Sequence, residues 1–394
     1  MAEVVLATES ERQIWDKDYL EESVRASRFA AYMGKAPTKI IIVKHELETE
    51  AGKTINIPLI TQLTNKGVGG STALRGRETQ IGNYNCPITI DWDRNAVVVP
   101  KSESYKTEIS FLNAGKPLLK NWTATALKMD IIYGLMSVIP VGNTTVPYAE
   151  ITDDLTNGGY QIATGYTPGS VFDRYEGVSW TTATEDNKDA WLALNSDRVL
   201  FGKTRSNISA NDHSAALTTL DTTNDKLTVA TAKLAKRMAE QARPAITPYM
   251  TEDGAEYYVM FCGPRSFRDL SEDSVMVAAN RDARAREGSG MDKNPLFQGG
   301  DLIYDGIIFR KVPEIPHIVN VGDSATTDVE PNFLCGQQAL GVAWGQTPTP
   351  QTEVNDYKFR PGIAIEELRG VKKLAFNGKQ NGCVTIYVAA GADS

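Results

Sequence analysis

The sequence lacks several features that mark particular classes of protein. No apolar run approaches the roughly twenty residues that a helix needs to cross a bilayer. The first residues, MAEVVLATESER, have neither the basic start nor the apolar stretch of a signal peptide. No internal repeat and no low-complexity tract is visible. We therefore expect a folded protein that stays where it is made.

Metal-ligating residues are few and scattered among the 394 residues. The cysteines are Cys86, Cys262, Cys335 and Cys383, and the histidines are His45, His213 and His317. No C-x-x-C pair occurs, which argues against a zinc site and against a small disulfide scaffold. Each histidine is isolated in sequence. We expect buried, reduced thiols, surface or interface histidines, and neither a metal nor another cofactor.

Candidate catalytic groups are also scarce. The segment GVGGST at 67–72 faintly resembles a phosphate-binding loop, but it lacks the lysine that reaches the phosphates and no helix is expected after it. Asp91 and Asp93 alternate with Trp92 and can project from one strand face, yet paired acids on an exposed face are usually just solvated. No nucleophile lies in a recognisable turn. The sequence therefore does not support an enzyme.

The composition is that of a globular protein, with 41% apolar and 23% charged residues, and the length suffices for at least two domains with separate cores. Forty-one basic residues against forty-nine acidic ones leave a net charge of −8. This balance disfavours general attraction to nucleic acid or to an anionic membrane.

A glycine-rich segment at 64–86 separates two stretches of strand-like alternation. The first stretch places Ile55, Ile57, Leu59 and Leu63 on one face, and the second places Ile88, Ile90, Trp92, Ala96 and Val98 on a buried face. Hairpin loops usually have about two to five residues, and a connection of about twenty is either functional or disordered. The segment therefore needs a partner surface, which indicates assembly.

Helical patterns lie on both sides of this region. A capping box at Ser10 opens a polar helix that ends near Gly34. A second helical region runs from about 104 to Pro140, with Pro117 in the first turn of its main part. Its expected apolar face consists of Leu118, Trp122, Met129, Ile132, Tyr133 and Met136.

Residues 141–214 are rich in Gly, Thr, Asn and Asp, which predicts loops and short strands. The aromatic residues of this stretch are Tyr148, Tyr160, Tyr166, Phe172, Tyr175 and Trp180. They could stack on sugars or bases, although such residues more often fill small cores.

Helices and strands alternate in the rest of the chain. Asn224 or Asp225 caps an amphipathic helix that stops at Arg243-Pro244 and carries Lys233, Lys236 and Arg237 on its outer face. A buried strand at 257–262 leads through Gly263-Pro264 into a helix. Asp305-Gly306 predicts a hairpin turn, and the last strand covers 384–389. This order predicts an α+β fold.

A basic cluster is formed by Arg281, Arg284 and Arg286, with Lys293 nearby, next to a glycine loop at 288–290. It could contact phosphate. Because the whole chain is acidic, pairing with acids of a neighbouring subunit or plain solvation is the favoured interpretation.

Several segments in order resemble one family of tailed-bacteriophage major capsid proteins, best known from large-genome podoviruses. They are YVMFCGPRSFRDL at 258–270, NPLF at 294–297, YDGII at 304–308, DRVLFG at 197–202 and AKRM at 235–238. The resemblance covers about 54–389, with 141–191 the most divergent part.

The resemblance implies the capsid fold shared by tailed phages and herpesviruses. The implied parts are an N-terminal arm (1–49), an extended E-loop (50–101), a spine helix of the peripheral domain (102–140), a variable insert and connection (141–215), a helix (216–244) leading to the axial domain (245–350), and a return to the peripheral domain (351–394). The implied E-loop tip contains Gly67, Gly69, Gly70, Arg75, Arg77 and Glu78, and the implied axial loop contains Arg281, Arg284 and Arg286.

The implied function is self-assembly, as hexamers and pentamers, into an icosahedral shell around phage double-stranded DNA, which is enclosed without sequence-specific binding. The partners would be many copies of the chain itself, with portal, scaffolding and decoration proteins as further candidates. The expected location is the virion, and the host cytoplasm during assembly. Two alternatives stay open: a cellular nanocompartment shell of the same fold, and a carbohydrate-binding or adhesin protein that uses Tyr160 or Trp180.

Overall fold

The computed structural model describes residues 27–49, 52–61, 63, 67–71, 74–75, 78, 81–106, 111–138, 175–176, 183–208, 210–251, 254–279, 297–298 and 301–392. They form two compact units. The described residues of Trp92–Leu127 and Gln346–Leu368 make the smaller unit, and those of Arg28–Asp91, Lys128–Gly345 and Arg369–Ser394 make the larger one. Neither unit is a continuous segment. The domain boundaries given above stay predictions.

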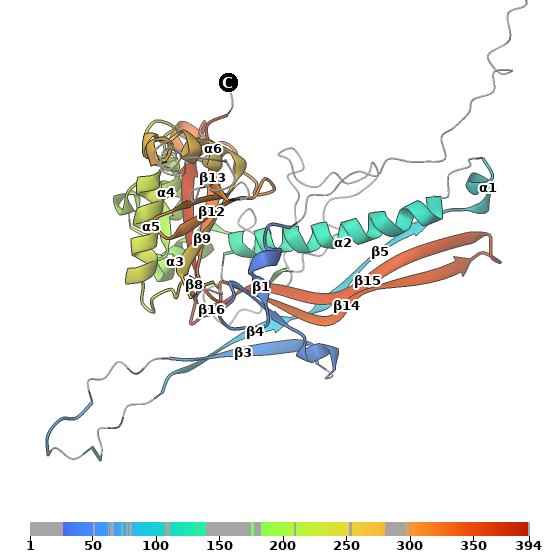
Figure 1. Ribbon diagram of the computed structural model, residues 1–394, viewed down its shortest axis with the longest axis horizontal. Helices are drawn as coiled ribbons and strands as arrows, with labels where there is room; N and C mark the ends of the chain where they lie inside the picture. The colour runs from blue at the N-terminus through green and yellow to red at the C-terminus, as the bar shows by residue number, and fades with distance from the viewer. Residues whose placement is uncertain are drawn as a thin grey trace, which may run out of the picture. The chain divides into compact units, whose positions relative to one another are not determined.

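A mixed sheet of eight strands forms the centre of the larger unit (Figure 1). Its order is β10-β11-β12-β9-β13-β18-β7, and β8 pairs with β9 outside this order. The pairs β12–β9 and β18–β7 are parallel, whereas β9–β13 and β13–β18 are antiparallel. The strands are β7 (Val199–Phe201), β8 (Tyr249–Met250), β9 (Glu256–Cys262), β10 (Phe297–Gln298), β11 (Asp301–Tyr304), β12 (Ile307–Lys311), β13 (Val329–Cys335) and β18 (Cys383–Ala389).

Helices cover both faces of this sheet, which explains why every residue of β13 and β18 is buried. The helices are α3 (Glu185–Asn195), α4 (His213–Thr218), α5 (Val229–Gln241) and α6 (Pro264–Glu272). Successive side chains of a strand point to opposite faces. Ile386 of β18 packs in the cluster that contains α5 and α6, whereas Tyr387 packs in the cluster that contains α3 and α4. The sheet therefore lies between two helical layers.

Several sequence predictions for this unit are confirmed. β9 is buried from Tyr258 onward and leads through Gly263 into α6. Asp305 and Gly306 connect β11 to β12 with φ angles of 51° and 71°, as a two-residue hairpin turn with two left-handed residues requires. All four cysteines are buried thiols that form no disulfide.

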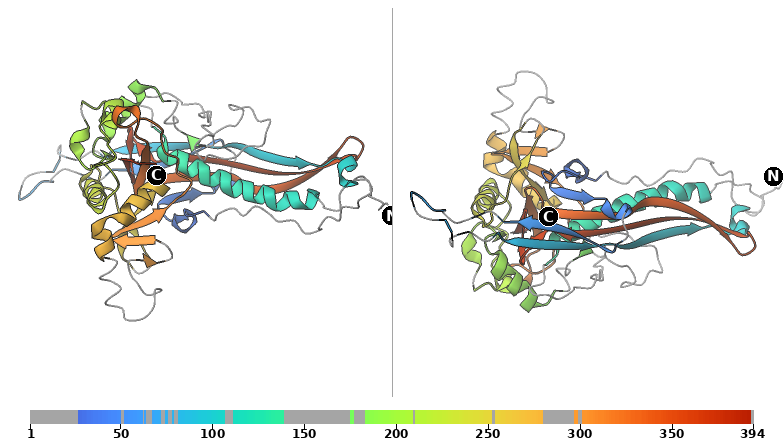
Figure 2. Two further views of the ribbon diagram at one scale, coloured as in Figure 1. Left: turned by 90° about the horizontal axis from the view of Figure 1, so that it is seen from above. Right: turned by 90° about the horizontal axis from the view of Figure 1, so that it is seen from below.

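A second sheet, with contributions to both units, has the order β1-β2-β14-β15-β5, and β6 pairs with β15. Its strands are β1 (Met33–Gly34), β2 (Ile41–Lys44), β5 (Asp91–Val98), β6 (Tyr175–Glu176), β14 (Leu340–Asn355) and β15 (Arg360–Lys373). In the smaller unit, Leu119 and Trp122 of α2 (Phe111–Met136) pack with Val97, Ile363 and Ile365 of the strands. Figure 2 shows this part of α2 running along β5 and β15.

The strands β3 (Thr54–Ile60) and β4 (Asn83–Thr89) form a separate antiparallel pair, which confirms the two predicted strands. One end of the pair is anchored to the rest of the larger unit. Ile57 and Ile88 are buried beside β14, where a Cβ on Gly341 would lie 2.5 Å from Ile88 Cδ1. Lys372 Nζ also donates to the carbonyl oxygen of Pro87, at 2.7 Å. Because Gly341 has no side chain, β4 can approach β14 closely.

The long helix differs from its prediction. Pro117 lies inside α2 and not in its first turn, the helix ends at Met136 before Pro140, and a separate short helix α1 (Lys101–Ser104) precedes it. The predicted apolar face was also partly wrong, because Leu119 is 4% exposed and Leu118 is 47% exposed. Neighbouring helical residues point about 100° apart, so contact with the sheet selects only one of them.

The predicted buried face at 88–98 is confirmed for Ile88 and Ile90 but is wrong for the strand β5 that follows them. Trp92, Ala96 and Val98 are exposed, whereas Asp93 is fully buried and Val97 faces α2. Ile90 separates β4 from β5, and such an interruption lets the second strand present the opposite face. The expectation that Asp93 is a solvated surface acid is therefore also wrong.

Two further parts of the chain have element boundaries that differ from the predicted ones. The prediction of loops and short strands at 141–214 holds for the short strand β7 but fails for 185–195, where the helix α3 buries Trp191, and for the start of α4 at His213. Helix α5 is capped by Thr228, whose hydroxyl accepts from Thr231 N at 3.3 Å, and not by Asn224 or Asp225.

The two ends of the described chain belong to different parts of the larger unit. The terminal strand β18 pairs with β13 and β7, and its assignment to the peripheral domain stays a prediction. Of the predicted N-terminal helix, the structure describes only the end, where a 3₁₀ turn at Ala30–Tyr32 leads directly into β1, so no helix continues to Gly34. Residues 10–26 lie outside the described residues.

Candidate assembly surfaces

The outer end of the β3–β4 pair exposes apolar side chains. Ile60, Leu63, Leu74 and Ile81 are each more than half exposed. Several exposed apolar side chains in one segment of a soluble protein favour an interaction site there. We name Ile60, Leu63, Leu74 and Ile81 the apolar end of the hairpin.

The glycines of the predicted E-loop tip have two different roles. Gly67 and Gly70 have φ angles of +73° and +68°, where a side chain would strain the backbone. A Cβ on Gly69 would meet nothing within 4 Å, so packing within this chain does not require glycine there. Arg75 and Glu78 are exposed. The described part of the tip therefore exposes backbone and charged side chains, and its role as an assembly interface stays a prediction.

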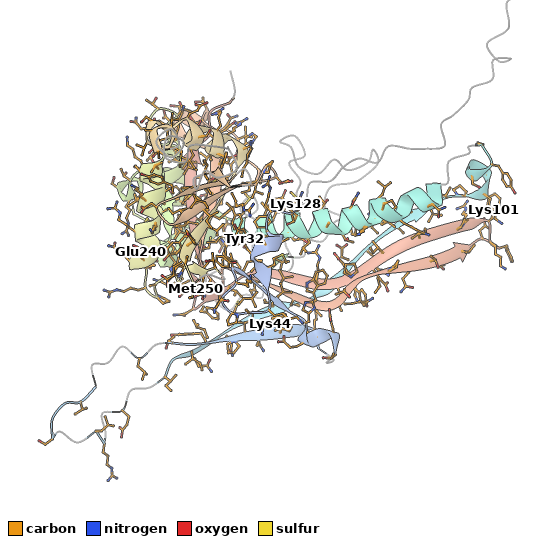
Figure 3. The ribbon with its side chains drawn as sticks, in the orientation of Figure 1. Tyr32, Lys44, Lys101, Lys128, Glu240 and Met250 are labelled. Atoms are coloured by element: carbon orange, nitrogen blue, oxygen red, sulfur yellow. The ribbon has the colours of Figure 1, made fainter. Side chains whose placement is uncertain are left out.

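A second exposed apolar surface, which the sequence analysis missed, lies at the turn between β14 and β15. Asp356, Tyr357 and Lys358 all have positive φ angles, and Tyr357 is fully exposed. Lys101 N of α1 donates to the carbonyl oxygen of Phe359 at 3.1 Å, and Tyr105, which follows α1, is 88% exposed. Figure 3 labels Lys101 beside this turn. The only sequence signal was a short polar and aromatic stretch between two alternating runs.

Helix α5 carries the predicted basic face. Lys233, Lys236 and Arg237 line a cavity of about 430 Å³ together with Ala230, Glu240 and Asp305. Lys236 Nζ donates to the carbonyl oxygen of Asp305 at 2.6 Å, and Lys233 Nζ lies 5.0 Å from the ring centre of Tyr304. Lys233 and Lys236 thus already interact with other residues of this chain. The residues that line the cavity include no histidine, cysteine or serine that could act as a nucleophile.

One of the three histidines lies elsewhere than predicted. His213 is fully buried, so the expectation of a surface position is wrong for it. Its ring centre lies 5.3 Å from Phe201 and 5.4 Å from Tyr387. Burial, together with the charge of Lys188, lowers the pKa of His213 to about 3, so this side chain is a neutral part of the core.

The other two histidines lie beside carboxylates. His45 Nδ1 is 2.8 Å from Glu48 Oε1, and His317 Nε2 is 3.8 Å from Asp328 Oδ2. Within the described part of the chain, no group of three or more histidine, cysteine, aspartate or glutamate side chains could hold a metal ion. No helix of the described residues is long and apolar enough to span a membrane.

Some predicted site residues cannot be placed. Arg77, the axial cluster of Arg281, Arg284 and Arg286, and Lys293 lie outside the described residues, as do the aromatic residues of the insert except Tyr175. Their roles stay predictions. No helix occurs among the described residues between Gly67 and Gly82, so the phosphate-loop interpretation gains no support.

Comparison of the whole chain with known proteins decides its family. A family model described as phage capsid protein matches residues 7–392. The chain belongs to this phage capsid protein family. A search of curated proteins found no match.

The phage capsid protein is similar to solved capsid structures along its whole length. The structure of the cyanophage Pam1 capsid asymmetric unit is 36% identical, with all of both chains covered and a TM-score of 0.83. The capsid of Ralstonia phage GP4 is 18% identical, with all of both chains covered and a TM-score of 0.71. The head of Helicobacter pylori bacteriophage KHP40 is 12% identical over 98% of this chain and 96% of that chain, with a TM-score of 0.60.

These matches confirm the α+β capsid fold and the resemblance to phage major capsid proteins. The protein is a structural subunit of a virus shell that is built from many copies. The protein is therefore a component of the virion. Neither the nanocompartment nor the carbohydrate-binding alternative is favoured.

Proposed function

We propose that the subunit forms hexamers and pentamers that close an icosahedral shell around phage double-stranded DNA, and that the β3–β4 hairpin is the E-loop that joins neighbouring copies. The apolar end of the hairpin carries this proposal. Its four large side chains are exposed in the subunit, while the opposite end of the same hairpin is buried beside Gly341. A rigid base with an apolar end suits insertion against another copy.

The physical chemistry of repeated contacts supports this role. A shell uses the same surface in several slightly different settings, so its contacts must tolerate small changes in angle. Gly67, Gly69 and Gly70 provide that tolerance because they lack a Cβ. Interfaces of obligate assemblies bury about 2,000–5,000 Å² in total, and an extended hairpin adds area that a compact subunit lacks.

The DNA part of the proposal rests on charge. The subunit has a net charge of −8, and an acidic wall does not bind the phosphate backbone tightly. Such a wall contains DNA without holding particular sequences. We also propose that assembly takes place in the host cytoplasm, where portal, scaffolding and decoration proteins are the expected further partners.

Deletion of residues 66–82 tests the E-loop assignment. We expect a soluble subunit with an unchanged circular dichroism spectrum, because none of the deleted residues that the structure describes is buried. We also expect that negative-stain electron microscopy shows no closed shells. Normal shells from this variant would refute the assignment.

A pair of point variants provides a sharper test. Ile60→Ser combined with Ile81→Ser removes two side chains of the apolar end and leaves the loop length unchanged. Val319→Ser is the matched control, because Val319 is also exposed but lies outside the hairpin. We expect shells from the control and free capsomers or subunits from the double variant.

A further inference from the structure

Cys335 and Cys383 are far apart in sequence but lie directly opposite each other on the antiparallel strands β13 and β18. Their Sγ atoms are 4.0 Å apart. Next to them, Gly336 N donates to the carbonyl oxygen of Gly382 at 2.8 Å. A hydrogen bond in that position makes Cys335 and Cys383 a non-hydrogen-bonded pair, in which the Cα atoms of opposite residues lie about 4.5 Å apart.

This spacing falls within the range that a disulfide requires, because disulfide-linked Cα atoms are usually about 4.4–6.8 Å apart. Rotation of the two side chains can therefore bring the sulfur atoms together with little movement of the strands. The other two thiols have no such neighbour in register. Cys86 is opposite Ile57, and Cys262 is opposite Lys311.

The surroundings of the pair favour one sulfur as the nucleophile. Lys373 is buried beside the thiols, and its Nζ donates to Ser137 O at 3.0 Å and to Gln380 Oε1 at 3.3 Å. The hydrogen bond from Cys335, aided by the charge of Lys373, lowers the pKa of Cys383, whereas burial raises the pKa of Cys335. The thiolate is the reactive form of cysteine. Both sulfur atoms are fully buried, so Cys383 is the first of the two to react when local opening of the strands admits an oxidant.

We propose that Cys335 and Cys383 form a modification site at which a peroxide produces an intrachain disulfide between β13 and β18. The Cys383 thiolate attacks one peroxide oxygen and the oxygen–oxygen bond breaks, which yields a sulfenic acid and hydroxide. The Cys335 sulfur then attacks the Cys383 sulfur and water leaves. In total, two thiols and one hydrogen peroxide give one disulfide and two water molecules.

The disulfide would join two residues that are 48 positions apart, with β14 and β15 inside the closed loop. Such a bond restricts the unfolded chain and thereby stabilises the folded subunit. The timing of disulfide formation, after assembly, rests on the proposed function. A subunit that assembles in reducing cytoplasm keeps both thiols, and a virion outside the cell meets oxidants. The bond would thus strengthen the finished shell without hindering its assembly.

The test uses full-length protein, purified with reductant and then exposed to hydrogen peroxide after the reductant is removed. Titration in denaturant should show a fall from four thiols to two. Peptide mapping without reductant should link the peptides that carry Cys335 and Cys383. The melting temperature should rise and should return to its initial value with dithiothreitol. Cys262→Ser is the matched control and should still lose two thiols, whereas Cys383→Ser should not form the link.

Three results would overturn the proposal: four thiols that persist, a link that includes Cys86 or Cys262, or oxidation of Cys383 to sulfinic acid without a link. The 66–82 deletion variant separates this proposal from the proposed function. It should form the same link although it forms no shells. A link in this variant together with normal shells would refute only the E-loop assignment.

Discussion

His213 and Glu330 show how single buried side chains govern the response of this capsid protein to pH. Both are fully buried in the larger unit, and burial disfavours the charged form of each group. It lowers the pKa of His213 to about 3, and it raises the pKa of Glu330 even though Ser266 N donates to its carboxylate at 2.6 Å. The two groups therefore affect stability in opposite directions as the pH changes.

We predict that His213→Leu reduces the acid sensitivity of the subunit. Below pH 6.5 the unfolded histidine binds a proton that the folded one does not bind, so the wild type loses stability as the pH falls towards 3. The loss from this residue is about 1.4 kcal/mol per pH unit. Urea unfolding of unassembled subunits between pH 7 and 4 measures it. If the free energy of unfolding had the same pH dependence in the variant and the wild type, the prediction would be wrong.

Glu330→Gln should have the opposite dependence. As the pH rises above about 4.3, the unfolded carboxyl ionises, whereas the folded one, whose pKa burial raises, ionises only at a higher pH. The wild type therefore loses stability as the pH rises through this window. The substituted glutamine does not ionise, and its amide oxygen can still accept from Ser266 N. We therefore expect the free energy of unfolding of the variant, relative to that of the wild type, to increase from pH 4 to pH 7. Glu330→Ala is the control that removes the acceptor, at a cost of about 1–3 kcal/mol at every pH.

At the scale of helices and strands, α2 is an element whose contact face was predicted only in part. The sequence favoured Leu118, and the structure buries Leu119 against Ile363 and Ile365. We predict that Leu119→Ala lowers the free energy of unfolding of the smaller unit by about 2–4 kcal/mol, because it leaves a cavity. Leu118→Ala is the matched control and should change it by less than about 0.5 kcal/mol. Thermal melting of both variants decides between the two faces.

The elements that the sequence predicted well have strong local signals. β9 is a continuous apolar run, and the turn at Asp305-Gly306 requires two left-handed residues that Asp and Gly tolerate. The elements that it missed depend on distant contacts. The face of β5 follows from α2, which packs against Val97, and Trp191 is buried because α3 covers one side of β18. No pattern within those segments contains that information.

The same limit applies to the candidate assembly surfaces. The length and glycine content of 64–86 predicted the need for a partner, and the exposed Ile60 and Ile81 agree with it. The turn at Tyr357 was missed because exposure of one aromatic residue depends on how far β14 and β15 extend. Pairing of Cys335 with Cys383 was missed because strand register fixes it, and register is not visible in two separate segments.

At the scale of the whole molecule, exposed apolar side chains of a shell subunit should contribute to assembly and not to folding. Tyr357 provides a direct test, because its side chain is fully exposed and follows Asp356 in a turn of left-handed residues. We predict that Tyr357→Ser leaves the melting temperature of the unassembled subunit unchanged, since an exposed side chain contributes less than about 0.5 kcal/mol to stability.

The same variant should impair assembly, because an aromatic anchor in an interface is often worth about 2 kcal/mol or more. Since about 1.4 kcal/mol corresponds to a tenfold change in an equilibrium constant, the subunit concentration needed for shells should rise at least about tenfold. Light scattering against concentration, with electron microscopy of the products, measures this threshold. Lys358→Ser is the matched control, because Lys358 is also exposed and also has a positive φ angle. Equal thresholds for the two variants would contradict the prediction, because they would show that the ring of Tyr357 adds nothing to assembly beyond what Lys358 adds.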